Sequence, residues 1–164
     1  MFNKELLLQS EKIKVWENPK ISGVGTIGSS NFAVDCTGDS RYGWSGYEIW
    51  RAFDKNTSTE YYNRCGSGAK EDYLTITMYA NKPIRLTNIT ITQTGYGFGS
   101  GILQYSDNGS SWKDIKTVNN GSNAISLTTF HRYWRIRKAA YENNSGGWRN
   151  INISEIYLRG FQQL

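Results

Sequence analysis

The sequence predicts an all-β protein built as an antiparallel β-sandwich, and three observations lead to this prediction. Apolar and polar residues alternate with a period of two over short stretches from about residue 72 onward. Gly, Asn and Ser, which favour turns, separate these stretches. The composition is rich in aromatic residues, with 6 Trp, 11 Tyr and 6 Phe, and 164 residues is the length of about one domain.

The expected strands follow one another at short intervals. They lie at residues 74–79, 86–91, 102–105, 112–118, 124–127, 133–137 and 151–158. Asn108-Gly109 supplies the positive φ of a tight hairpin turn between the third and fourth of these strands. Trp134 and Ile136 are expected to face the core, with Arg135 and Arg137 facing solvent.

The last strand changes its apolar phase. Ile151 and Ile153 share one face, whereas Ile156 and Leu158 would share the other in a regular strand. A β-bulge at Ser154-Glu155 would bring all four to one face and redirect the Glu155 side chain.

The beginning of the chain has a different pattern. Ile13 and Val15 alternate with lysines before Asn18-Pro19 ends the alternation. We therefore expect residues 1–22 to form an N-terminal arm, a linker or a first strand, and residues 23–164 to form the sandwich domain.

Composition excludes several classes of protein. The apolar runs are too short for a membrane helix, aromatic and β-branched residues are too frequent for a disordered chain, and alanine is too scarce for a helical bundle. A single histidine, His131, excludes a site that needs two imidazoles, and we expect it to be structural. The formal net charge is +5, but basic residues are dispersed, so no nucleic-acid surface is predicted.

Two cysteines, Cys36 and Cys65, are too few for a zinc site, and they form either a disulfide or free thiols.

Three loops, at residues 37–51, 93–101 and 141–150, combine glycines with aromatic and polar side chains. Exposed rings in such loops are candidate ligand platforms, although a Trp there could instead fold back and close the end of the sandwich. The aromatic candidates are Tyr42, Trp44, Tyr96, Phe98 and Trp148. The polar candidates are Asp39, Arg41, Asn144 and Arg149. Trp112 and Trp134 are expected in the framework.

Five motifs in a fixed order resemble the discoidin family, which comprises the coagulation-factor C-type domains and the related family-32 carbohydrate-binding modules. They are Ala52-Phe-Asp-Lys-Asn-Thr-Ser-Thr59, Asp72-Tyr-Leu-Thr-Ile76, Tyr105-Ser-Asp-Asn-Gly-Ser-Ser-Trp112, Arg132-Tyr-Trp-Arg-Ile136 and Ile153-Ser-Glu-Ile-Tyr-Leu-Arg-Gly160. The resemblance covers about residues 30–160. It implies a galactose-binding-like jelly roll whose apical loops bind glycans or, in some animal members, lipid head groups or protein.

Many members of that family hold a structural calcium ion. The resemblance places its ligands at Asp54, Asn56, Thr59 and Glu155, oxygen donors of the kind that calcium prefers. Lys55 stands where the family usually has Gly, so it would be strained at positive φ, and its ammonium could replace the ion. In the alternative without calcium, Asp54 caps a turn and Glu155 pairs with Lys55 or Arg51.

The function expected from these features is non-catalytic binding of a cell-surface glycan. The setting would be a phage tail or another receptor-binding protein outside the cell or on a virion, and display as a homo-oligomer would add avidity. The alternative is a domain that binds protein or anionic lipid. A hydrolase is not expected, because the acidic residues are scattered and no nucleophile motif is present.

Overall fold

The computed structural model describes residues 12–66, 74–95, 97–140 and 149–164, and its regular structure is almost entirely β, as the sequence predicts. The strands are β1 (Ile13–Glu17), β2 (Phe32–Cys36), β3 (Gly43–Trp44), β4 (Tyr47–Glu48), β5 (Tyr61–Cys65), β6 (Thr75–Gln93), β7 (Ser100–Ser106), β8 (Lys113–Asn119), β9 (Gly121–Ala124), β10 (His131–Ala140) and β11 (Arg149–Gln163). One short 3-10 helix, η1 (Ile49–Phe53), follows β4. Among the described residues, no helix is both long enough and apolar enough to span a bilayer.

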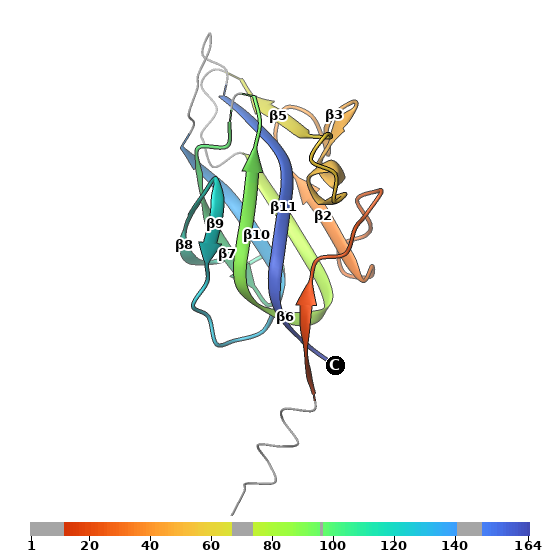
Figure 1. Cartoon of the computed structure of the whole chain (residues 1–164), viewed down its shortest axis with the longest axis vertical. Coiled ribbons are helices and arrows are strands. Elements are labelled where there is room, and N and C mark those ends of the chain that lie inside the picture. The colour runs from red at the N-terminus through yellow and green to blue at the C-terminus, as the bar shows by residue number, and fades with distance from the viewer. Residues whose placement is uncertain (1–11, 67–73, 96, 141–148) are drawn as a thin grey trace, which may run out of the picture.

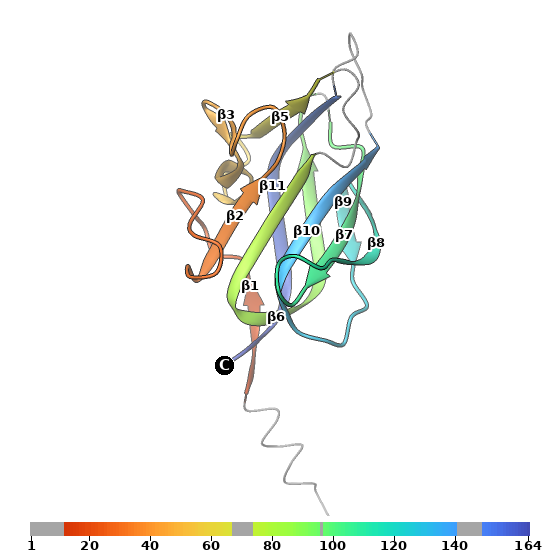
Figure 2. The same ribbon diagram turned by 180° about the vertical axis from the view of Figure 1, so that it is seen from behind.

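The long strand β6 belongs to both layers of the sandwich. Its first part, through Ala80, pairs with β2 and β10, and β10 continues the layer to β7 and β8. Its second part, from Ile84, pairs with β11 and β9. Both views show β6 turning back at the end of the molecule where the C-terminus lies (Figures 1 and 2). All of these pairings are antiparallel.

The other central strand, β11, pairs with β5 through its first residues and with β6 and β1 through the rest. Its register with β6 shifts between Ile153 and Glu155, so the predicted bulge is confirmed. As a result Ile151, Ile153, Ile156 and Leu158 are all buried in the core.

Strand β1 lies at the edge of this layer. Ile13–Glu17 pairs with Arg159–Gln163 of β11, so this part of residues 1–22 is a strand of the main sheet. Residues 1–11 lie outside the described part of the chain, and the proposed boundary at residue 22 stays a prediction.

The core lies between the two layers and contains Trp134 and Ile136, as predicted from the alternation in β10. It also contains Phe98, whose side chain is fully buried. The prediction that Phe98 belongs to a ligand platform is therefore wrong. The Phe98 ring packs against the side of β7, where a Cβ on Gly101 would come within 2.9 Å of Phe98 Cζ.

Several parts of the strand pattern differ from the prediction. The strand expected at 124–127 is β9 at Gly121–Ala124, because the Asn123 side chain bonds Asn119, Gly121 and Ile89 and so places this short segment beside β6. Strands β2, β3, β4 and β5 were not predicted, and the two strands expected at 74–79 and 86–91 are parts of the single strand β6. The predicted hairpin of β7 and β8 and the positive φ of Gly109, +75°, are confirmed, but residues 107–112 form a longer loop than the tight turn that was predicted.

Cys36 and Cys65 are both buried and are not joined in a disulfide, which decides between the alternatives left by the sequence. Burial raises the pKa of Cys36 to about 11, so its thiolate form is scarce at neutral pH.

Replacing Phe98 by Ala should destabilise the fold by about 3–5 kcal/mol, because it leaves a cavity in the core. Trp44→Ala, at an exposed ring, should lower the free energy of unfolding by less than about 1 kcal/mol. Urea denaturation of both variants measures the difference. Equal losses would show that Phe98 is not a core residue.

The two thiols should be unreactive toward a thiol-specific chromogenic reagent in the native protein and should both react after denaturation. The absorbance of the released chromophore counts them. Rapid reaction of either thiol in the folded protein would contradict the burial described above.

Candidate functional site

A β-hairpin made of β3 and β4 covers the outer side of β5 at the end of the sandwich away from β1 (Figure 1). The loop before this hairpin is held by the fully buried Asn63 side chain. Its amide donates to Ser40 O at 2.8 Å, and its Oδ1 accepts from Ser40 N at 3.3 Å. A Cβ on Gly38 would approach Asn63 to 2.5 Å, so this contact requires glycine. A strand residue thus positions the loop that the sequence singles out.

The hairpin itself depends on an unusual backbone. Tyr42 has φ 65° and Gly43 has φ 99°. Two hydrogen bonds hold the strained Tyr42 in this conformation. Ile49 N donates to Tyr42 O at 2.6 Å, and the Ser40 hydroxyl donates to the next carbonyl, Gly43 O, at 2.6 Å. This backbone brings Trp44 opposite Tyr47 in the hairpin.

The outer side of β5 and β11 supplies the floor beneath the hairpin. Tyr62 and Arg64 alternate with buried residues of β5, and in register they lie opposite Asn152 and Asn150 of β11. The Tyr62 hydroxyl donates to Asn150 Oδ1 at 3.0 Å. The Arg64 guanidinium lies 4.4 Å from the centre of the Trp44 ring. These contacts fix the rings from below.

Three aromatic rings and three polar residues enclose a shallow pocket of about 270 Å³. It is lined by Trp44, Ser45, Tyr47, Glu60, Tyr62 and Asn152. The Tyr62 ring centre is 6.1 Å from that of Trp44 and 6.2 Å from that of Tyr47, with tilted and edge-on geometry. Trp44 and Tyr47 remain 37% and 43% exposed, so their rings are available to a ligand.

The polar side of the pocket is also held in place. The Thr94 hydroxyl donates to Glu60 Oε2. Asn152 is 6% exposed, and its buried Oδ1 has no hydrogen-bond partner among the described residues. Burial of an unsatisfied acceptor is unfavourable, so Asn152 Oδ1 is a locally destabilising group beneath the pocket.

The residues predicted as ligand contacts divide into four groups, one of which is Phe98 in the core. Trp44 lies in the pocket and packs on Tyr62 without closing the sandwich end. Asp39, Arg41 and Tyr42 belong to the same loop but do not line the pocket, and the Arg41 guanidinium donates to the Tyr42 hydroxyl at 2.8 Å. The remaining candidates, Tyr96, Asn144, Trp148 and the side chain of Arg149, lie outside the described residues.

Sequence reasoning missed Tyr47, Glu60, Tyr62 and Asn152. Tyr47 lies within the glycine-rich loop that was singled out, so its aromatic character was an available signal. The other three lie in or beside β5 and β11, and only the pairing of these strands brings them under the hairpin.

Asp54, after η1, organises a tight turn. Its Oδ1 accepts from Asn56 N at 2.8 Å and its Oδ2 accepts from the Thr59 hydroxyl at 2.7 Å. Thr59 Oγ1 also lies 2.8 Å from Asn56 O. Three of the four predicted calcium ligands are therefore together, and Asp54 also caps the turn, as expected in the alternative without calcium.

Glu155, the fourth predicted ligand, faces this turn from β11. Both of its carboxylate oxygens are buried, and the backbone N–H groups of Lys55 and Asn56 lie close enough to lower its pKa, although neither meets full hydrogen-bond geometry. Burial nevertheless raises its pKa to about 7, with the Asp54 charge acting in the same direction and the Lys55 charge acting against it. Arg51 does not serve as its partner, because Arg51 pairs with Glu48 at 2.8 Å.

Lys55 adopts φ 58°, the positive value that the resemblance leads one to expect at a position usually held by Gly. Its ammonium lies 3.7 Å from the centre of the Tyr157 ring and 3.5 Å from Asn18 Oδ1. Burial lowers its pKa, and the nearby Glu155 charge raises it. The ammonium is thus attracted to Glu155 but is held by other groups.

The donor set fits a hard divalent cation. It consists of two carboxylates, the Asn56 amide and the Thr59 hydroxyl, and the two Glu155 carboxylate oxygens are buried without a hydrogen bond of full geometry among the described residues. Among the described residues, no group of three or more His, Cys, Asp and Glu side chains could hold a metal ion. An ion here would therefore rely on neutral and backbone oxygens beside the two acids.

His131 lies away from the pocket and holds two loops. Its Nδ1 is 2.6 Å from Asp107 Oδ1, its Nε2 is 2.7 Å from Thr129 Oγ1, and its ring stacks on Tyr105 at 3.8 Å between centres. The side chain is buried, as suits the structural role expected for it.

Comparisons with known proteins identify the fold. No family model matches the sequence, and no curated protein is significantly similar to it. Among solved structures, an F5/8 type C domain from Bacteroides fragilis has a TM-score of 0.61 and 17% identity, covering 81% of this chain and 93% of that one. The family 32 carbohydrate-binding module of Clostridium perfringens NanJ, solved with galactose, has a TM-score of 0.59 and 14% identity, covering 79% and 93%.

A family 89 glycoside hydrolase from C. perfringens has a TM-score of 0.60 and 19% identity, and the match covers 80% of this chain but only 14% of the hydrolase. The chain therefore has the discoidin-like β-sandwich fold shared by F5/8 type C domains and family 32 carbohydrate-binding modules.

Proposed function

We propose that this domain is a non-catalytic carbohydrate-binding module whose ligand occupies the pocket under the β3–β4 hairpin. The observation that carries the proposal is the combination in one pocket of exposed aromatic rings and fixed polar groups. Aromatic rings pack against the apolar C–H faces of a pyranose, and fixed polar groups bind its hydroxyls. The NanJ module, which has the same fold, is solved in complex with galactose and so supports this ligand class.

The pocket is suited to binding and not to glycoside hydrolysis. Glu60 is the one carboxylic acid among the described residues that line it. Inverting and retaining glycosidases generally require two carboxyl groups on opposite sides of the scissile bond. A bound sugar would meet rings, an amide and one acid, which position it without cleaving it.

Glu60 also bears on the alternative of anionic lipid binding. The exposed rings of Trp44 and Tyr47 at a hairpin tip could enter a membrane surface. A carboxylate beside them would repel an anionic head group, so the pocket favours a neutral glycan. The proposed setting in a phage tail or another receptor-binding protein, outside the cell or on a virion, stays a prediction from the sequence.

Trp44→Ala and Tyr62→Ala should each weaken glycan binding by at least about 10-fold, because each removes a ring that would pack on the sugar. A glycan array identifies the sugar, and isothermal titration calorimetry gives the affinities. Arg41→Ala is the matched control, because it alters the same loop outside the pocket, and it should leave the affinity within about two-fold.

A loss with Arg41→Ala and none with Trp44→Ala would place the ligand elsewhere on the loop. Salt-sensitive binding of the protein to anionic vesicles, with no sugar binding on the array, would favour the lipid alternative instead.

We also propose a structural calcium ion held by Asp54, Asn56, Thr59 and Glu155. Its support is the buried Glu155 carboxylate facing Asp54. The Glu155 oxygens make no hydrogen bond of full geometry among the described residues, and a divalent cation would satisfy them. A bound calcium ion would neutralise the two acids and tie β11 to the turn after η1. The Lys55 ammonium lies on the Tyr157 ring, where it can remain when an ion is bound.

Calcium should raise the melting temperature at pH 8 more than at pH 5, and chelator should reverse the effect. Without calcium, the raised Glu155 pKa of about 7 means that stability decreases as pH rises from about 4.5 through about 7, since the folded state prefers the protonated acid. Glu155→Gln should remove both the calcium effect and this pH dependence. Differential scanning calorimetry measures both, and an equal calcium effect in Glu155→Gln would contradict the proposal.

A further inference from the structure

Strand β1 has one hydrogen-bonded edge and one free edge. Leu164 N donates to Lys12 O at 2.8 Å, and Asn18 N donates to Leu158 O at 3.2 Å. Hydrogen-bonded pairs alternate along an antiparallel ladder, so the backbone groups of the even-numbered residues of β1 are the ones that bond to strand β11. The backbone N–H and C=O groups of Ile13, Val15 and Glu17 point the other way, and among the described residues no strand pairs with that side.

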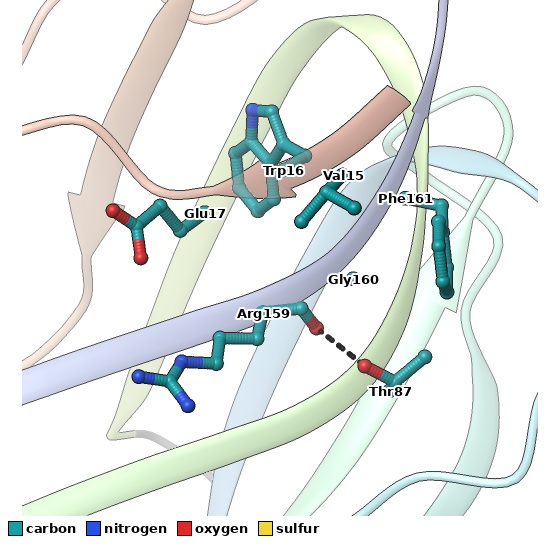
Figure 3. Close-up of a pocket in the computed structure, with 7 residues that line it drawn as sticks. All are labelled: Val15, Trp16, Glu17, Thr87, Arg159, Gly160 and Phe161. Atoms are coloured by element: carbon teal, nitrogen blue, oxygen red, sulfur yellow. Dashed lines mark hydrogen bonds between the residues drawn. The ribbon is translucent and has the colours of Figure 1, made fainter. Parts of the chain in front are cut away.

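Two β-branched side chains on this strand are unusually exposed to solvent. Val15 is 82% exposed and Ile13 is 36% exposed. Val15 lies beside Phe161 on the rim of a depression of about 570 Å³, which Arg159 and Thr87 also line (Figure 3). An exposed edge with apolar side chains is a template for pairing with another strand.

We propose that β1 pairs with β1 of a second copy of this chain in an antiparallel register centred on Val15. Pairs 13/17, 15/15 and 17/13 would then all be hydrogen-bonded pairs, because these residues have their backbone groups on the free edge. Between them, Lys14 lies opposite Trp16 of the second copy, where an ammonium and an indole attract each other.

The sequence of β1 favours this register over the registers centred on Lys14 and on Trp16. A register centred on Lys14 would place two lysines directly opposite each other, which is destabilising. A register centred on Trp16 would place Ile13 opposite Pro19, which has no N–H to donate. With Val15 at the centre, Glu17 faces Ile13, and its charge remains next to Arg159 of its own chain.

A second copy suits this edge better than an unrelated strand does. The pairing is self-complementary about a two-fold axis, so it uses the whole free edge of both copies and closes at a dimer. It joins the two sheets into one continuous sheet and leaves no free β1 edge for further addition.

The geometry has one consequence for function, and this consequence rests on the proposed function. Strand β1 runs toward the end of the sandwich where β3 and β5 lie (Figures 1 and 2). In an antiparallel pair, the second copy is inverted, so the two pockets would open in opposite directions. Such a dimer would cross-link two glycan surfaces.

Light scattering of the full chain over a range of concentrations tests the dimer without reference to any sugar. The mass should rise from 18.7 kDa to twice that value as concentration increases. Val15→Pro removes one N–H on the free edge and no bond to β11, so it should shift the dimer midpoint to at least about 10-fold higher concentration. Val15→Thr keeps the N–H and the β-branch and should preserve the dimer.

Cysteine cross-linking tests the register. At Val15 the two Cα atoms would be about 5.5 Å apart, which a disulfide can span. Ile13 lies on the same face, but its two copies would be offset by four residues, about 13 Å along the strand. Under mild oxidation, Val15→Cys should form a covalent dimer and Ile13→Cys should not, while the buried Cys36 and Cys65 do not contribute.

A mass of one chain at every concentration overturns the proposal, as does a dimer that Val15→Pro leaves unchanged. Equal cross-linking at positions 13 and 15 overturns the register. Loss of sugar binding has no bearing on these outcomes, so failure of the dimer and failure of the proposed function are distinguishable.

Discussion

The hydrogen-bond ladder of β11 is the constraint on which the rest of this structure depends. One strand of 15 residues pairs with β5 near its start and with β6 and β1 farther along, so it connects the pocket end to the opposite edge. The register of this ladder with β6 shifts at two points, at the bulge at Ser154 and between Arg159 and Gly160. At the bulge the Ser154 hydroxyl donates to Thr92 O at 3.2 Å, so a side chain supplies a bond where the backbone register shifts.

The bulge divides the outward side of β11 into regions of different chemistry. Before it, Asn152 faces the hairpin and lines the pocket. Directly after it, Glu155 is turned beneath the loop that follows η1. Farther on, Tyr157 and Phe161 carry cations on their rings, namely Lys55 at 3.7 Å and Arg85 at 4.8 Å. The inner side is apolar from Ile151 to Leu158, because the bulge restores the phase of the apolar residues. A single extra residue thus permits polar and ionic sites outside a uniform core.

Polar groups that are buried on this outward side of β11 reduce the stability of the fold when they lack hydrogen-bond partners. Glu155 and Asn152 both present buried oxygens without hydrogen bonds of full geometry among the described residues. Such atoms are destabilising in isolation, and they persist in proteins where binding or chemistry needs them. The pocket and the proposed calcium site therefore share one feature, which is a buried oxygen atom that makes no hydrogen bond of full geometry among the described residues.

The sequence by itself determined the all-β class, most strands after residue 74, the bulge at Ser154 and the burial of Trp134, because these follow from the local period of apolar residues and from turn chemistry. It also singled out Trp44. It misjudged Phe98, since a ring in a glycine-rich loop can face either solvent or core, and only packing against Gly101 decides which. Tertiary structure alone decided that Glu60, Tyr62 and Asn152 share a pocket, because strands distant in sequence must pair before their outward side chains become neighbours.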